Sequence, residues 1–107
     1  MSNANGGAGT SALLRIEGEM TIYRALELKQ ALLEGLEASD ALEVDLAAVT
    51  ELDTAGVQVL LLAKRAARAR QRELRLVAHS PQVLEVFEQL NLTTHFGDPL
   101  VMSPRSA

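Results

Sequence analysis

The feature that most constrains the fold of this chain is a change of hydrophobic period along its middle. Residues 42–46 read Leu-Glu-Val-Asp-Leu, and this alternation of apolar and acidic side chains predicts a half-buried strand. From Val57 to Arg70, apolar and basic residues recur at helical spacing, and no Pro or Gly follows until Pro81. A strand joined to a helix by a short connection favours a layered α/β fold.

The connection itself reads Leu-Asp-Thr-Ala-Gly-Val over residues 52–57. It places an acid, a hydroxyl and a glycine where the helix begins. Such a helix start carries unpaired backbone N–H groups and the positive end of the helix dipole. A hydroxyl there can cap the helix, and it can also carry a phosphate that the helix end stabilises. Thr54 is therefore the first candidate functional residue, with capping alone and capping plus a partner role both open.

The remaining elements complete an alternating β-β-α-β-α-β-α order. Strands separated by helices predict crossover connections and a mostly parallel sheet. An initial hairpin around Gly18 adds an antiparallel edge. We therefore expect an α/β fold with a mixed, mostly parallel sheet of four to five strands and helices packed against it. The expected elements are strands at 12–16 and 20–23, a helix at 24–38, a strand at 42–46, a helix from near Ala55, a strand at 73–78, and a helix that starts at Ser80-Pro81 and ends near Asn91.

The composition predicts one domain with an aliphatic core. The chain has 107 residues, 48% hydrophobic and 3% aromatic, which suits a single core. We expect tails at residues 1–11 and 103–107 around a domain at 12–102. The absence of Cys excludes disulfides and thiolate metal sites. Two histidines are too few for a His-based metal site unless carboxylates join them, so no metal or cofactor is expected.

The sequence also predicts a cytoplasmic protein without membrane insertion. The longest apolar run, residues 59–63, is far shorter than the roughly 20 residues of a membrane span. The first eleven residues have neither the basic nor the apolar region of a signal peptide.

Charge is unevenly distributed. Residues 1–53 contain ten acids and three bases, whereas residues 54–107 contain four acids and seven bases. Six bases fall between Lys64 and Arg75, which suits either a charged partner surface or a solvated helix face. The net charge of −4 and the scarcity of aromatics argue against nucleic-acid binding.

The helix after the connection has two different faces. Because an α-helix turns by about 100° per residue, its apolar residues fall mainly on one side and its basic residues on the other. Val57 and Leu61 fall on the basic face, beside Thr54, which predicts a partner contact unless a loop covers them. The expected core stripe comprises Val59, Leu62, Ala63, Ala66 and Ala69, and the basic face comprises Lys64, Arg65 and Arg68.

Taken together, these motifs resemble the STAS domain of anti-sigma factor antagonists and of the cytosolic parts of sulphate transporters. The resemblance extends from Ala12 to about Met102. It implies the α/β fold described above and a role in protein binding. The resemblance is based mainly on three motifs: Val44-Asp45-Leu46, Asp53-Thr54-Ala55-Gly56 and Val57-Gln58-Val59-Leu60-Leu61-Leu62. Supporting motifs are Gly18-Glu19-Met20 and Ser80-Pro81 with Phe87 and Leu90.

The resemblance implies a partner switch, with one departure. In the family the turn commonly reads Asp, two hydroxyl residues and Gly, and a partner kinase that is also the anti-sigma factor phosphorylates the second hydroxyl. Here that position is Ala55, and Thr54 precedes it. Either Thr54 acts as the phosphate acceptor or hydrogen-bond donor, or the domain binds its partner permanently. The small STAS subunit of a phospholipid-transporting ABC system, which binds the ATPase, represents the permanent type.

The sequence thus predicts a non-enzymatic protein-binding regulatory module. A catalytic Thr54 would need a base and an oxyanion site, and only His79 and His95 could serve as the base, so no catalytic residue is expected. Gly56 would let a partner backbone approach closely, and Lys64 and Arg68 would form a charged rim. The predicted partner-binding residues are Asp53, Thr54, Gly56, Val57, Leu61, Lys64 and Arg68, with Thr54 as the candidate phosphorylation site.

Overall fold

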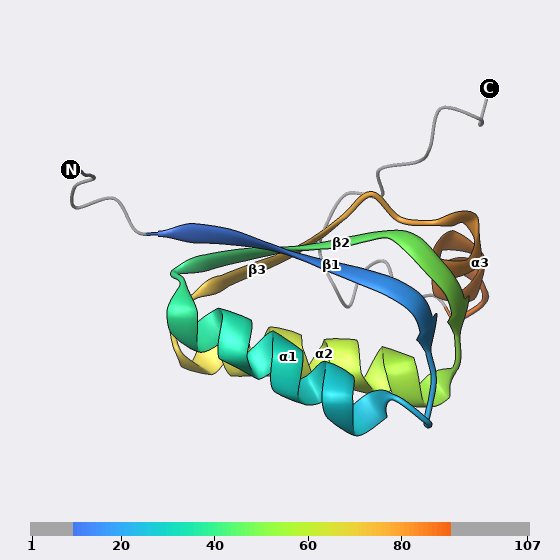
Figure 1. Ribbon diagram of the computed structural model, residues 1–107, viewed down its shortest axis with the longest axis horizontal. Helices are drawn as coiled ribbons and strands as arrows, with labels where there is room; N and C mark the ends of the chain where they lie inside the picture. Colours follow the sequence, from blue (N-terminus) through green and yellow to red (C-terminus); the bar gives the residue numbers. More distant parts are fainter. Residues whose placement is uncertain (1–9, 91–107) are drawn as a thin grey trace.

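A parallel three-stranded sheet covered on one face by two helices forms the centre of residues 10–90, the part of the chain that the computed structural model describes. The strand order is β1-β2-β3. Helices α1 and α2 lie side by side against one face, and α3 lies at one end of the sheet beside β2 (Figure 1). The elements are β1 (Ser11–Met20), α1 (Ala25–Ala38), β2 (Ala41–Leu52), α2 (Thr54–Ala69), β3 (Glu73–Val77) and α3 (Pro81–Gln89).

The predicted N-terminal hairpin is wrong. Residues 11–20 form one continuous strand that pairs in parallel with β2. The turn expected at Gly18 is an irregularity within this strand, where Gly18 adopts a φ of 83°. A glycine tolerates this conformation without a steric penalty, so the chain continues in the same direction. Within residues 10–90 the sheet is therefore parallel throughout and has three strands, instead of the mixed sheet of four to five strands that we expected.

The irregularity bends the sheet toward the helices. The pairing of β1 with β2 shifts between Arg15 and Glu17, and again between Gly18 and Glu19. Each shift leaves an extra residue on β2, which is why β2 has 12 residues and β1 has 10. Bulges of this kind bend strands. In Figure 1 both strands curve at this end toward the first turns of α1 and α2.

The core follows the predicted apolar pattern in α1 and β2. Leu28, Leu32 and Leu36 form the buried face of α1, as their spacing predicted. Strand β2 is longer than predicted, but its alternation is confirmed: Leu42, Val44 and Leu46 are buried, and the acids between them lie on the other face. The sheet and helices enclose an aliphatic core that contains Phe87 of α3.

Helix α2 is rotated relative to the predicted core stripe. Of that stripe, Val59 and Ala63 are buried, but Leu62 and Ala66 are half-buried and Ala69 is exposed. The helix packs against both α1 and the sheet, so its buried face is wider than one stripe. The additional buried residues are Gly56, Val57, Leu60 and Ala67.

The helix ends follow known capping rules. Ser80 caps α3 through a hydrogen bond from the Val83 N–H (3.2 Å), and Pro81 is the first helical residue, as predicted. After α2, Gln71 adopts a φ of 57°, and the Arg72 N–H donates to the Ala67 carbonyl at 2.8 Å. This is a Schellman-type ending, and it directs Arg72 toward α1. The predicted tails and the segment after Thr93 lie outside residues 10–90, apart from Thr10 and Ser11.

Candidate functional site

The first turn of α2 is capped by Asp53. Asp53 has extended backbone, and its Oδ1 accepts a hydrogen bond from the Gly56 N–H at 3.0 Å. Its backbone carbonyl also accepts from the Val57 N–H at 3.0 Å. Thr54 is the first helical residue and is exposed. The prediction that Thr54 caps the helix is therefore wrong, because the acid one residue earlier has that role.

Asp53 also joins this helix start to the segment between β1 and α1. Its second oxygen, Oδ2, accepts a hydrogen bond from the Ile22 N–H at 3.1 Å. Its own backbone N–H donates to the Met20 carbonyl at 3.2 Å. One residue thus connects the end of β1, residues 21–24 and α2. Two stretches that are distant in sequence meet beside Thr54.

Gly56 is required by contacts within the chain. It is buried in the first turn of α2, and a Cβ at this position would overlap the backbone carbonyl of Met20 and crowd the Leu52 side chain at 2.7 Å. We expected Gly56 to admit a partner backbone. The backbone that approaches it is instead the end of β1.

The predicted exposure of Val57 is also wrong. Val57 is 3% exposed and belongs to the core, and Leu61 is half-buried against it. The reason is the rotation of α2, which places its first turn against β1. Neither side chain presents an open apolar surface next to Thr54.

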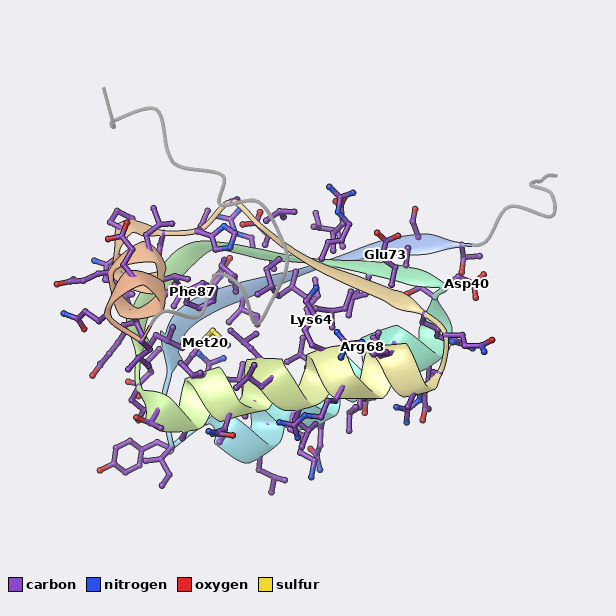
Figure 2. All side chains as sticks on the ribbon, turned by 180° about the vertical axis from the view of Figure 1, so that it is seen from behind. Met20, Asp40, Lys64, Arg68, Glu73 and Phe87 are labelled. Carbon is purple, nitrogen blue, oxygen red and sulfur yellow. The ribbon has the colours of Figure 1, made fainter. Side chains whose placement is uncertain are left out.

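The predicted basic rim lies far from this site. Lys64 donates from Nζ to the Leu74 carbonyl of β3 at 2.7 Å, so its ammonium faces the sheet edge. Arg68 is exposed, but it follows Thr54 by four helical turns, about 21 Å along the axis. Figure 2 shows Lys64 and Arg68 along α2, with Met20 toward the opposite end. Of the seven predicted residues, Asp53, Thr54 and Gly56 are brought together at the helix start.

An exposed apolar patch that the sequence analysis missed lies beside Thr54. Ile22 is 67% exposed, Tyr23 90% and Leu26 67%. The backbone of Ile22 is held by Asp53, so the patch borders the start of α2. The sequence signal was the position of Leu26 off the buried Leu28-Leu32-Leu36 face, and we had placed Tyr23 in a strand.

Charged side chains of both signs lie close to this patch in the chain. Glu27 and Lys29 follow Leu26 in α1, and both are exposed. Arg24 is the basic residue of this segment, and its Nη1 donates to the carbonyls of Glu17 and Glu19, both at 2.7 Å. The guanidinium is thus directed into the backbone of β1. Its Nη2 also pairs with Glu27 Oε2 at 3.4 Å, so the patch is apolar, with charges of both signs beside it.

The described residues offer little for metal chemistry. Within residues 10–90, no three His, Cys, Asp or Glu side chains gather so that they could hold a metal ion. His79 is 2% exposed and contacts the Phe87 ring edge-on, with 5.6 Å between centroids. His95 lies outside the described residues. None of the described helices is long and apolar enough to cross a membrane.

Several solved structures share this fold. SpoIIAA, an anti-sigma factor antagonist in its unphosphorylated form, is 16% identical, with a TM-score of 0.68 over 88% of this chain and 81% of that chain. An anti-sigma factor antagonist from Mycobacterium paratuberculosis is 24% identical, with a TM-score of 0.65 over 87% of this chain and 78% of that chain. A sulfate transporter family protein from Wolinella succinogenes is 18% identical, with a TM-score of 0.69 over 81% of this chain and 71% of that chain.

A family model identifies the chain more directly than these distant structures. No curated protein matches the chain in sequence. The model described as "Mlab, STAS domain" matches residues 4–102, which is most of the chain and agrees with the observed α/β architecture. The chain therefore belongs to the STAS domain family.

Proposed function

We propose that this domain is a protein-binding regulatory module of the cytoplasm whose docking surface comprises Ile22, Tyr23, Leu26 and Thr54. The observation that carries this proposal is the exposed apolar patch that Asp53 holds beside Thr54. Exposed aromatic and aliphatic side chains that cluster in this way are typical of interaction sites. Tyr23 is the natural anchor, because tyrosines are enriched among residues that dominate binding energy.

The apolar character of the docking surface favours one kind of partner. Glu27, which pairs with Arg24, and the exposed Lys29 give its surroundings charges of both signs, so a complementary partner would present an apolar hollow with polar groups around it. A kinase of the anti-sigma type is the partner class that the solved anti-sigma factor antagonists suggest. In this interpretation Thr54 is the candidate phosphorylation site, and its exposure supports access by a kinase.

A second candidate function is constitutive binding. Ala55 lacks a hydroxyl at the position where the family usually carries its phosphate acceptor. A domain without an acceptor would bind permanently, as the STAS subunit of a phospholipid-transporting ABC system binds its ATPase. Both functions use the same docking surface, and neither requires catalysis by this domain.

The docking surface is tested by changing Tyr23 and measuring affinity for a purified candidate partner by calorimetry. The partners tested are a kinase of the anti-sigma type and the ATPase of a phospholipid-transporting ABC system. We expect Tyr23→Ala to weaken binding at least tenfold, about 1.4 kcal/mol or more. Arg68→Ala is the matched control, because it lies at the other end of α2 and should leave the affinity unchanged. If a partner binds Tyr23→Ala as tightly as it binds the original chain, the proposed docking surface is overturned.

The two candidate functions are separated by intact mass. The protein is incubated with ATP and the cognate kinase, and Thr54→Val is the control. One added phosphate in the original chain and none in Thr54→Val supports the switch. An unmodified chain that binds the ATPase stably supports the constitutive function and overturns the switch.

A further inference from the structure

We propose that Asp53 is a positioning residue that fixes the two halves of the docking surface relative to each other, and that a negative charge on Thr54 releases one of them. The proposal rests on the proposed function, since it concerns the same surface. It differs from simple repulsion of a partner, because the charge acts through the geometry of this chain.

The two carboxylate oxygens of Asp53 have separate roles. Oδ1 accepts from the Gly56 N–H at 3.0 Å and so caps α2. Oδ2 accepts from the Ile22 N–H at 3.1 Å and so holds the segment that carries the apolar patch. The side chain is half-buried between them. Asp53 therefore need not contact the partner in order to control binding.

Other contacts of residues 21–24 lead elsewhere. The Arg24 N–H donates to the Thr21 carbonyl at 2.9 Å, within the segment. The Arg24 guanidinium donates to carbonyls of β1 and to the Glu27 carboxylate of α1, and the Thr21 hydroxyl donates to the Glu19 carboxylate of β1. Within residues 10–90, the Ile22–Asp53 hydrogen bond is the one that links this segment to the start of α2. Its loss should loosen the segment selectively.

A phosphate on Thr54 would disturb this link directly. It would add about −1.5 to −2 charges on the residue adjacent to the Asp53 carboxylate. Phosphate oxygens also accept from the N–H groups of a helix start, and they would compete with Asp53 for the Gly56 N–H. Repulsion and competition both displace the carboxylate, so the Ile22 N–H loses its acceptor.

The test uses substitutions that preserve the cap but remove the link. Asp53→Asn can still cap α2, because Asn is as effective as Asp at this position, but an amide nitrogen replaces one oxygen and cannot accept from Ile22. Asp53→Ser also caps, and its side chain is too short to bridge both groups. Thr54→Glu introduces a charge, and Thr54→Gln is its uncharged control.

The measurement is amide hydrogen exchange by NMR, with no partner present. We expect the Ile22 amide to exchange about tenfold faster in Asp53→Asn, Asp53→Ser and Thr54→Glu than in the original chain. Thr54→Gln should leave it unchanged. The Val44 amide, in the central strand where Val44 pairs with Leu14 and Leu76, reports global opening, and its exchange should change less than that of Ile22 in every variant.

The outcomes separate this inference from the proposed function. If Ile22 exchanges at the original rate in folded Asp53→Asn and Asp53→Ser, the positioning role is overturned, even where Tyr23→Ala abolishes partner binding. If Thr54→Glu and Thr54→Gln exchange alike at Ile22, the charge-driven release is overturned. Faster exchange in the three variants supports the inference, and Tyr23→Ala then tests the docking surface independently.

Discussion

The α-carbon of Gly56 lies so close to the backbone carbonyl of Met20 that a Cβ would overlap the carbonyl oxygen. The first turn of α2 thus packs directly on the last residue of β1. This approach also allows the Asp53 N–H to reach the same carbonyl. The position of the candidate site therefore depends on a residue without a side chain.

Gly56→Ala should destabilise the domain by about 1–3 kcal/mol, because a backbone carbonyl cannot move aside as a side chain can. Urea unfolding measures the change. Gly35→Ala in α1 is the matched control: its Cβ would meet only the Leu42 side chain, at 3.0 Å, and alanine gains up to about 1 kcal/mol of helix propensity. We expect a change within about 1 kcal/mol there. Equal losses in both variants would contradict the special role of the Gly56 contact.

Arg72→Ala should loosen the end of α1. The Arg72 Nη1 donates to the carbonyls of Leu36 at 2.5 Å, Ser39 at 2.8 Å and Glu37 at 3.1 Å. These are carbonyls at a helix end that lack partners in the helix, and charged hydrogen bonds contribute about 1.5–3 kcal/mol. We expect a loss in that range by urea unfolding.

Arg65→Ala serves as the control for Arg72, since Arg65 is exposed on α2 and should change stability by less than about 0.5 kcal/mol. Arg72→Lys should restore only part of the loss, because one ammonium does not reproduce the planar guanidinium. Full restoration by Lys would show that charge alone is needed.

Val57→Ala and Leu26→Ala distinguish the core from the docking surface. Val57 is buried and Leu26 is largely exposed. Removing two buried methyl groups should cost about 1.5–3 kcal/mol, whereas the exposed substitution should stay within about 0.5 kcal/mol. Thermal unfolding followed by circular dichroism tests both. If Val57→Ala is as stable as the original chain, the burial of Val57 in the core is contradicted.

Arg24→Ala should destabilise the curved end of β1 by about 1–2 kcal/mol, since the guanidinium satisfies two backbone carbonyls. Arg15→Ala is the control, because its ion pair with Glu17 at 3.6 Å is exposed, and such pairs contribute at most about 1 kcal/mol. Chemical denaturation gives both values. The prediction fails if the two substitutions cost the same.

Local chemistry explains why part of the site was predictable. Helix starts follow short-range rules, and α2, predicted to begin near Ala55, begins at Thr54. The assignment of the cap to Thr54 was wrong because both Asp53 and Thr54 are good capping residues. Sequence cannot choose between adjacent capping residues when the choice depends on where Ile22 lies.

Long-range contacts explain the errors in the fold. Gly18 favours a turn when only its neighbours are considered, but pairing with β2 keeps residues 11–20 in one strand. The rotation of α2 has the same origin. Its apolar residues cover a wide arc, and the close approach of Gly56 to Met20 selects which part of that arc is buried.

The sequence by itself determined the order of most elements, the aliphatic core of α1 and β2, and the start of α2. These depend on periodicity and capping, which act over a few residues. Only the tertiary structure decided that Val57 is buried and that Tyr23 and its apolar neighbours lie beside Thr54. The bend of β1 and the two hydrogen bonds of the Asp53 carboxylate bring residues 21–24 to α2, and no local pattern records a contact between segments about thirty residues apart.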